Sequence, residues 1–146
     1  LDRDSFALFM SHAQAEGADQ VSNLTLLLRQ QGIRCWYDME AERLQLIDMT
    51  RGIINSDFFL LYLTQSYFDR YFCRFESTFA KTLGKPLLVV WESDSRHGGI
   101  PDYVGLVKHA TRRHPEFADW LLSTEAIPMA RRAFHRKATV AEIIKR

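Results

Sequence analysis

Hydrophobic residues along the chain gather in four short strand-like runs, separated by segments with helical spacing. The runs cover residues 6–10, 33–38, 58–63 and 86–91. The run at 58–63 shows no alternation of apolar and polar positions, which is typical of a strand covered on both faces. Strands that alternate with helices predict a parallel sheet with helices on both of its sides.

Apolar residues recur every three or four positions between the runs, which predicts amphipathic helices there. The first of these helices carries Val21, Leu24, Leu27 and Leu28, and the second carries Leu46, Ile47, Ile53 and Ile54. Gly32 stands where a glycine commonly follows a helix, so we expect the first helix to end there.

The third expected helix follows the run at 58–63 and is rich in aromatic residues. Its apolar positions form one stripe, made of Phe68, Phe72, Phe75, Phe79 and Leu83. We expect this stripe to face the core, with Glu76 at its margin, about 80° around the helix from the centre of the stripe. Gly84 and Pro86 are expected to end the helix.

The last third of the chain has a weaker pattern. Its glycine and proline residues predict a loop at 93–101. A short helix is expected at 118–122 and a closing helix at 139–145. Residues 126–129 are expected to form an edge strand, because Pro128 is poorly tolerated in a central one.

Composition supports a single folded domain. The chain has 146 residues, of which 47% are hydrophobic and 25% are charged, near the averages for globular proteins. Together with the expected elements, this predicts one α/β domain over residues 1–146. Its architecture would be a flavodoxin-like three-layer sandwich, with a parallel sheet of about five strands and helices on both faces.

Net charge and cysteine content limit the classes of partner and the cellular compartment that we expect. The formal net charge of +1 does not favour a dedicated nucleic-acid binder, and the basic residues at 131–137 are better explained by a solvated helix face. Cys35 and Cys73 are too few for a disulfide framework or a zinc site, which favours a reducing, cytoplasmic compartment and no metal. We expect no signal peptide and no membrane span, because no apolar run approaches the ~18 residues that a span needs.

Several enzyme classes lack their motifs in this chain. It contains no P-loop, no Gly-x-Gly-x-x-Gly after the first strand and no Gly-x-Ser-x-Gly elbow. Ser11 and His12 are neighbours on an extended segment and point to opposite sides, so they do not form a nucleophile–base pair. A response-regulator receiver shares the architecture, but it needs acidic residues where this chain has Ser11-His12 and Thr64-Gln65.

The segment at 56–76 carries the motif of a known family. Its strand ends at Thr64, Tyr67 follows, and the next helix begins with the sequence Phe72-Cys73-x-x-Glu76. This resembles the Toll/interleukin-1 receptor (TIR) domain, in which a strand that ends in Ser or Thr leads to a Tyr and then to a Trp-Cys-x-x-Glu helix.

Other segments agree with this resemblance. Residues 6–12 resemble the first box of the family, and residues 32–38 resemble its second strand, which the BB loop follows. The Ile-Asn-Ser step at 54–56 also fits. The resemblance is strongest over residues 6–92, where four pieces occur in consecutive order.

TIR domains that keep the helix glutamate resemble NAD glycohydrolases, so the resemblance implies that Glu76 is the catalytic carboxylate. It also implies that NAD+ is the substrate, that no further cofactor is needed, and that the products are nicotinamide and ADP-ribose or a cyclic isomer. Nicotinamide leaves as a neutral molecule without a general acid, and a fixed carboxylate can stabilise the oxocarbenium-like ribose. The alternative is a surface glutamate beside a core stripe.

Open parallel sheets bind ligands at the carboxyl ends of their strands. The candidate substrate-binding residues are Ser11, His12, Asp38, Arg43, Phe72, Cys73 and Trp91. Phe72 stands where the family has Trp, and it is either a core residue or a stacking partner of nicotinamide. His12 either contacts the substrate or is a turn residue. Ala13 stands where many members have Arg, so a diphosphate would need another cation such as Arg43.

Residues 39–46 correspond to the BB loop, which in this family reaches a neighbouring domain. The candidate contact residues are Met39, Glu40, Glu42, Arg43 and Leu44, although a solvated loop is the alternative. In enzymatic members the site is completed across two domains, so the resemblance implies self-association with other TIR domains in immune or cell-death signalling. The competing hypothesis is a non-enzymatic adaptor that acts through TIR–TIR interactions alone.

Overall fold

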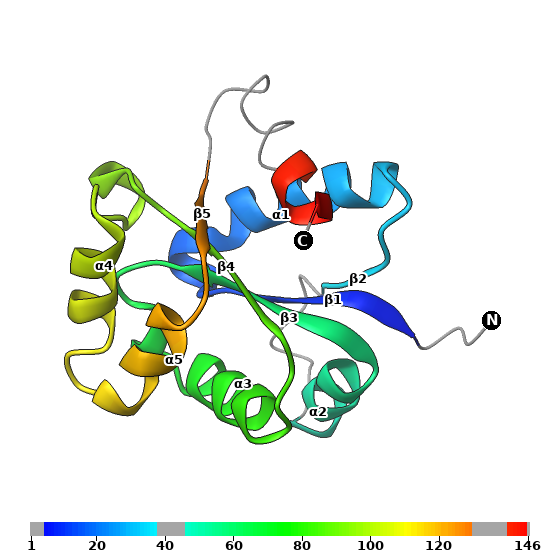
Figure 1. Ribbon diagram of the computed structural model, residues 1–146, viewed down its shortest axis with the longest axis horizontal. Coiled ribbons are helices and arrows are strands. Elements are labelled where there is room, and N and C mark those ends of the chain that lie inside the picture. The colour runs from blue at the N-terminus through cyan, green and yellow to red at the C-terminus, as the bar shows by residue number, and fades with distance from the viewer. Residues whose placement is uncertain (1–4, 38–45, 130–139, 146) are drawn as a thin grey trace.

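A computed structural model describes residues 5–37, 46–129 and 140–145 of the chain. Its centre is a five-stranded sheet of order β2-β1-β3-β4-β5, in which all neighbours are parallel. The strands are β1 (Phe6–Ser11), β2 (Cys35–Trp36), β3 (Ser56–Leu63), β4 (Leu87–Trp91) and β5 (Ala126–Pro128). This order, with β5 at an edge, confirms the predicted flavodoxin-like fold (Figure 1).

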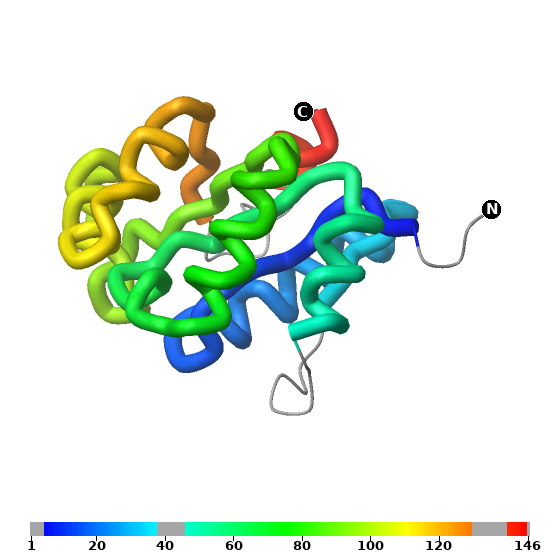
Figure 2. The backbone as a smooth tube through the Cα atoms, turned by 90° about the horizontal axis from the view of Figure 1, so that it is seen from below, coloured from blue at the N-terminus to red at the C-terminus, as the bar shows by residue number. Residues whose placement is uncertain are grey.

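Helices cover both faces of the sheet and give the molecule three layers (Figure 1 and Figure 2). On one face lie α1 (Gln14–Gln30) and the helical residues 140–145. The other face is covered by α2 (Leu46–Ile54), α3 (Tyr71–Thr82), α4 (Tyr103–Ala110) and α5 (Ala118–Leu122). Among the residues described, no helix combines the length and the apolar character needed to cross a membrane.

Alternation along the strands builds a separate hydrophobic core on each face of the sheet. In β3, Phe59 and Leu61 pack with the α3 side, whereas Leu60 and Tyr62 pack with the α1 side. All four side chains are fully buried. β3 is therefore covered on both faces, as its unbroken apolar run predicts.

Gly32 ends α1, as predicted. Its backbone has a φ of +83°, its N–H donates to the carbonyl of Arg29 at 3.0 Å, and the N–H of Ile33 donates to the carbonyl of Leu28 at 3.0 Å. These two bonds form a Schellman motif, which favours glycine in the left-handed region.

Replacing Gly32 with alanine is expected to lower the free energy of unfolding by about 1 kcal/mol, because an L residue is strained at this φ. An added Cβ meets no atom of the described chain within 4 Å, so the cost is conformational and not steric. Urea denaturation measures the effect. The neighbouring Gln31→Ala, at a φ of −91°, is the control and should change stability by less than about 0.5 kcal/mol. Equal stabilities of the two variants would contradict the strain argument.

The buried face of α3 differs from the predicted aromatic stripe. The helix turns Cys73, Glu76, Ser77 and Ala80 inward, at the spacing i, i+3, i+4 and i+7. Phe72 is 44% exposed and Leu83 is 46% exposed, so the prediction that the whole stripe faces the core is wrong. Phe68 is fully buried, but it lies before α3, in the 3-10 turn Tyr67–Asp69.

The physical reason is the size of the side chains on α3. Cys, Ser and Ala let the helix backbone approach the sheet, while Tyr67 and Phe68 from the preceding turn fill the core beside it. Phe75 and Phe79 then flank the contact with half-buried, stacked rings. Glu76 is one of the four inward residues, and at 8% exposure it is the least buried of them. At about 100° per residue it lies at the edge of the buried face, on the side next to the aromatic stripe.

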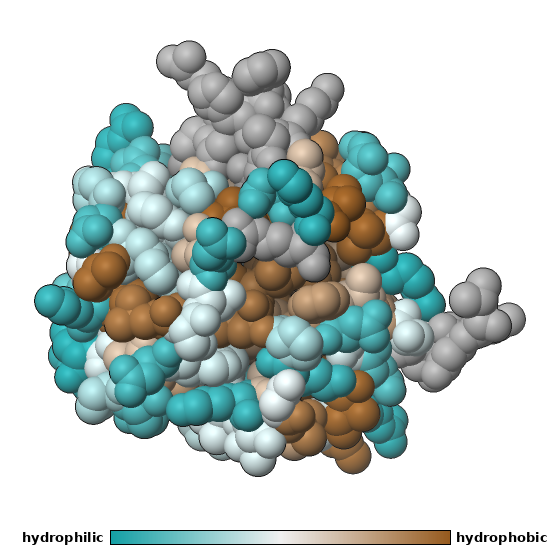
Figure 3. All heavy atoms as spheres, viewed as in Figure 1, coloured by the Kyte–Doolittle hydropathy of each residue, from teal (hydrophilic) through white to brown (hydrophobic). Residues whose placement is uncertain are grey.

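The second helix also turns some predicted apolar residues outward. α2 buries Met49, Gly52 and Ile53, whereas Ile47 and Ile54 are more than half exposed. Hydrophobic side chains are visible over α2 at the lower edge of the molecule in Figure 3. The approach of α2 to the sheet depends on glycine, because a Cβ on Gly52 would lie 2.7 Å from the ring of Trp36.

Two further elements differ from the expected ones. Among the described residues of the run expected at 33–38, only Cys35–Trp36 form β2, whereas Ile33, Arg34 and Tyr37 lie outside the strand. The sequence pattern gave no signal for α4 (Tyr103–Ala110), because Pro101 and Gly105 near its start resemble a loop. Its start is marked instead by Asp102, whose carboxylate accepts the N–H of Gly105 at 2.9 Å.

Candidate active site

Ser11 and Glu76 meet at the carboxyl end of β1. Along β1, Phe9 and Ser11 point to the same face of the sheet, which α3 covers. Ser11 Oγ donates a hydrogen bond to Glu76 Oε1 at 2.7 Å. Ser11 is 1% exposed and Glu76 is 8% exposed, so the contact is buried without being sealed from solvent.

Tyr67 and Ser77 extend this contact into a chain of hydroxyl groups. The hydroxyl of Tyr67 lies 2.5 Å from Ser11 Oγ and 3.0 Å from Ser77 Oγ, and both Tyr67 and Ser77 are fully buried. Tyr67 follows β3, the neighbour of β1, and the helices after these two strands lie on opposite faces. The cluster therefore sits at the topological switch point, where such sheets bind ligands.

Burial controls the charge of Glu76. Loss of hydration raises its pKa from 4.5 to about 7, and the hydrogen bond from Ser11 opposes part of this rise. The carboxyl group consequently changes charge near neutral pH. A carboxyl group tuned in this way is typical of catalytic sites.

Cys73 attaches the start of α3 to the end of β1. Its Sγ donates to the main-chain oxygen of His12 at 3.5 Å. Burial, reinforced by the charge of Glu76, raises the pKa of the Cys73 thiol well above its usual value. The thiol therefore stays protonated, and its role is that of a hydrogen-bond donor and not of a nucleophile.

His12 lies between β1 and α1. Its Nε2 is 3.1 Å from Gln14 Oε1, and its ring is tilted against that of Tyr37 with ring centres 5.4 Å apart. Burial lowers the pKa of His12 to about 4, so the imidazole is neutral at physiological pH. It can hydrogen-bond or stack, but it supplies no positive charge for a diphosphate.

A second buried carboxylate lies on the α1 side of the sheet. Glu92, directly after β4, accepts a hydrogen bond from the hydroxyl of Tyr62 at 2.6 Å and another from the N–H of Asp94 at 3.0 Å. Glu92 is fully buried. Because the sheet separates it from the α3 side, it belongs to a different polar cluster from Glu76.

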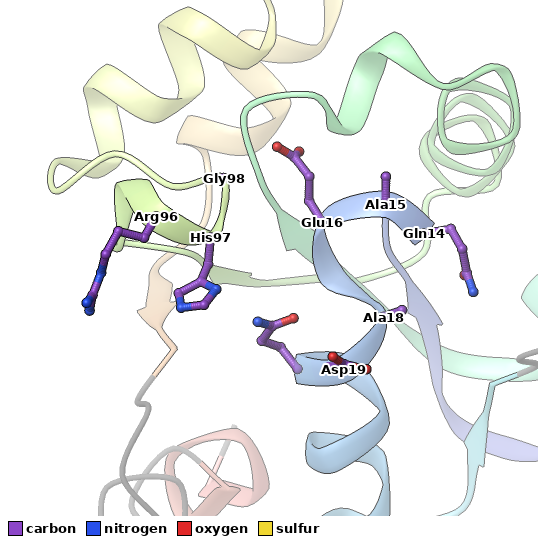
Figure 4. Close-up of a pocket in the computed structure, with 9 residues that line it drawn as sticks. Gln14, Ala15, Glu16, Ala18, Asp19, Arg96, His97 and Gly98 are labelled. Carbon is purple, nitrogen blue, oxygen red and sulfur yellow. The ribbon is translucent and has the colours of Figure 1, made fainter.

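An open pocket of about 460 Å³ lies at the carboxyl edge of the sheet, between the first turns of α1 and the 3-10 turn after β4 (Figure 4). Its lining residues are Gln14, Ala15, Glu16, Ala18, Asp19, Gln20, Arg96, His97 and Gly98. Glu16 binds away from it, accepting hydrogen bonds from the N–H and the hydroxyl of Ser66. The pocket lies at the predicted edge, but none of the predicted site residues lines it.

Comparison with known proteins identifies the family. The sequence profile described as "TIR domain" matches residues 8–122. The chain belongs to the TIR domain family. The match includes Ser11, Tyr67, Cys73, Glu76 and Ser77, so the whole buried hydroxyl cluster lies within it.

A solved structure supports the fold of this TIR domain. The TIR domains of the activated Roq1 resistosome, which directly recognises the pathogen effector XopQ, align with a TM-score of 0.66 at 13% sequence identity. The alignment covers 97% of this chain and 98% of that chain. At this identity, the likeness shows a shared fold. No curated protein matches the chain significantly.

Within this TIR domain, four of the predicted site residues come together at the end of β1. Ser11 bonds Glu76, and Cys73 bonds the main chain of His12 one position further along. These contacts join β1 to α3. Glu76, the carboxylate of the sequence motif, is therefore part of a buried contact between these two elements.

Two other predicted site residues are not part of this hydrogen-bonded cluster. Phe72 lies one turn before Glu76 on α3 and is exposed, with its ring edge-to-face against Tyr71. Trp91 is on β4, beyond β3, and packs against Tyr103 with ring centres 5.7 Å apart. Asp38 lies outside the described residues, as do the predicted BB-loop residues Met39, Glu40, Glu42, Arg43 and Leu44.

Two members of the cluster, Tyr67 and Ser77, were not among the predicted site residues. Tyr67 belongs to the family motif, and Ser77 directly follows Glu76. The signal that could have identified them is the face of α3: Ser77 lies one turn after Cys73, and both are small residues next to a carboxylate. Spacing along the chain could not have shown that Ser11 contacts Tyr67, because these two residues are 56 positions apart.

Proposed function

We propose that this TIR domain is an NAD+ glycohydrolase in which Glu76 is the catalytic carboxylate. The observation that carries the proposal is the state of Glu76: it is 8% exposed, hydrogen-bonded by Ser11, and poised to change charge near pH 7. Its place at the switch point of an open parallel sheet supports a ligand-binding role. The family resemblance supplies the substrate class, NAD+.

The reaction needs little proton transfer. The bond between ribose and the cationic nicotinamide ring breaks with its electron pair going to the ring nitrogen, so nicotinamide leaves neutral. The ribose then carries oxocarbenium-like positive charge, which the ionised Glu76 stabilises. A water molecule adds to the sugar and loses a proton, giving ADP-ribose, whereas attack by an adenine nitrogen of the same molecule gives a cyclic product.

Burial makes this stabilisation effective. An ionised carboxylate attracts a nearby cation much more strongly in a poorly hydrated site than in water. Ser11 holds one oxygen of Glu76, so the direction of the carboxylate is fixed before the substrate arrives. The neighbouring Cys73 and Tyr67 stay protonated, so neither competes as a charged group.

Substrate contacts beyond Glu76 are part of the same proposal. Phe72 exposes its ring on α3, which leaves it able to stack on a planar group such as nicotinamide. His12 is neutral and able to hydrogen-bond the substrate. Because His12 brings no charge, the diphosphate needs a cation from elsewhere, and Arg43 is the candidate.

Self-association of TIR domains is the proposed means of activation, in immune or cell-death signalling in the cytoplasm. Exposed apolar side chains on α2 and α3 support such contacts. They include Ile47, Ile54 and Tyr71. Burying them against a second TIR domain removes apolar surface from water, which stabilises the assembly.

Nicotinamide release from NAD+ tests the proposal, with the protein concentrated on beads and the products separated by chromatography. We expect wild-type protein on beads to turn NAD+ over faster than the same amount in dilute solution. Glu76→Gln should be at least about 100-fold slower, since it removes the charge and keeps the shape. Glu116→Gln, at a surface glutamate, is the matched control and should behave as wild type. Equal rates for Glu76→Gln and wild type would exclude Glu76 as the catalytic group.

A second candidate function, a non-enzymatic TIR adaptor, is favoured by the same exposed apolar residues of α2 and α3. It predicts assembly without chemistry. Bead-bound wild-type protein that self-associates but releases no nicotinamide would support the adaptor and exclude the enzyme.

A further inference from the structure

We propose that the hydroxyl groups of Ser77, Tyr67 and Ser11 form a directed hydrogen-bond relay that ends on Glu76 and sets when this carboxyl group is ionised. The relay makes Tyr67 and Ser77 positioning residues that act through Ser11. Its catalytic consequence rests on the proposed function, whereas the relay itself is a property of the folded domain.

The direction of each bond follows from the inventory of protons. An ionised carboxylate only accepts, so Ser11 donates its one hydroxyl proton to Glu76 at 2.7 Å. Ser11 Oγ must then accept from Tyr67 at 2.5 Å, and the oxygen of Tyr67 must accept from Ser77 at 3.0 Å. Three donors therefore point along one path toward the negative charge.

Protonation of Glu76 reverses the path. The neutral carboxyl group is then able to donate to Ser11, which turns its proton to Tyr67, and Tyr67 turns its own to Ser77. Each hydroxyl rotates and keeps its proton. Only Glu76 gains or loses a proton, and it exchanges this proton with solvent. No other acid or base changes its protonation state.

The burial of the three hydroxyl groups strengthens the effect of the relay on Glu76. Ser77 and Tyr67 are fully buried and Ser11 is 1% exposed, so these hydroxyl groups have little access to bulk water. Hydrogen bonds polarise one another in such a site, and the last donor is stronger for having a donor behind it. The path also begins and ends on adjacent residues of α3, so it links this helix to β1 and to the turn after β3.

The other titratable groups packed around Glu76 in the described chain keep their charge between pH 5 and 8. His12, which directly follows β1, is neutral because burial lowers its pKa to about 4. Tyr67 and Cys73 are protonated, because burial raises the pKa of each. The positive charges of Arg70 and Arg74 act on the neighbouring Cys73. A titration seen in this cluster over that range therefore belongs to Glu76.

The test is the titration midpoint of Glu76, followed by NMR of carboxyl-labelled glutamate in the folded domain without NAD+. Tyr67→Phe removes one hydroxyl and should move the midpoint upward by about one pH unit. Ser11→Ala should move it further, and Ser77→Ala less, because the three donors lie at increasing distance along the path. A clustered preparation should show the same upward order in its pH–rate profile.

Tyr62→Phe is the matched control. It also removes a fully buried tyrosine hydroxyl bonded to a glutamate, but on the opposite face of the sheet, so the midpoint of Glu76 should stay in place. If Tyr67→Phe does not fold, Ser11→Ala and Ser77→Ala decide the order. An unchanged midpoint in the folded variants, or a shift as large in Tyr62→Phe, overturns the relay. Absence of NAD+ turnover by wild type would overturn the proposed function and leave the NMR result to judge the relay.

Discussion

Glu76→Gln is expected to make the domain more stable above pH 7 while it removes the turnover of NAD+. The folded protein raises the pKa of Glu76 from 4.5 to about 7, so between these values the folded state binds a proton that the unfolded state has released. Stability therefore falls as the pH rises from about 4.5 to about 7 and then stays level. The total loss in the wild type is about 3 kcal/mol.

The glutamine variant has no charge to bury, so it escapes this loss. At pH 8 we expect it to exceed the wild type in free energy of unfolding by about 1–3 kcal/mol, the lower value allowing for an imperfectly bonded amide. At pH 5 the two proteins should be nearly equal. Urea denaturation at both pH values measures the difference, with Glu116→Gln as the control for a general change of charge.

A gain in stability together with a loss of turnover would mark Glu76 as a group kept for function at a cost to the fold. A different result separates the explanations. If Glu76→Gln is less stable than the wild type at pH 8, the ionised carboxylate contributes to folding, and its burial has a structural reason. The stability measurement needs no substrate, so it stands apart from the assay of NAD+ cleavage.

Local patterns predicted the elements whose chemistry is local. α1 ends at Gly32 because the backbone there is left-handed, a conformation that glycine adopts most easily. A single glycine in the sequence is therefore enough to predict the end of this helix. The apolar run of β3 requires cover on both faces wherever it lies, which fixes the layering of helices around it. These features depend on few distant contacts, and they were confirmed.

The orientation of α3 depends on distant contacts, and spacing alone could not predict it. The helix offers two stripes at helical spacing, one aromatic and one of small and polar residues that includes Glu76. The aromatic stripe has the larger apolar area, so a count of apolar area alone predicts that it faces the sheet. In the structure the small and polar stripe packs against the sheet instead, because Tyr67 and Phe68 already fill the core beside α3. Only the position of that preceding turn decides the outcome.

The candidate site shows the same division. The motif around Cys73 and Glu76 is contiguous, so the carboxylate could be selected from the sequence. The hydroxyl chain joins β1, the turn after β3 and α3, and no pattern along the chain connects Ser11 with Tyr67. The buried environment that tunes Glu76 is therefore a product of the fold and not of the motif.

The rate of NAD+ cleavage by the wild type should rise about 100-fold between pH 5 and pH 8, with half of the maximal kcat/KM reached at about pH 7. The reason is that only the ionised form of Glu76 stabilises the ribose cation, and about one molecule in a hundred is ionised two units below the pKa. The measurement is kcat/KM for bead-clustered protein at intervals from pH 5 to pH 9.

The stability of the fold provides an internal control for this profile. Titration of Glu76 makes the folded state more stable at pH 5 than at pH 8, which is the reverse of the expected activity. A loss of turnover in acid, with the circular dichroism spectrum unchanged, therefore reports the charge of Glu76 and not unfolding. A rate that falls with rising pH would show instead that the protonated carboxyl group acts as a general acid, and a flat profile would show that its charge has no part in the reaction.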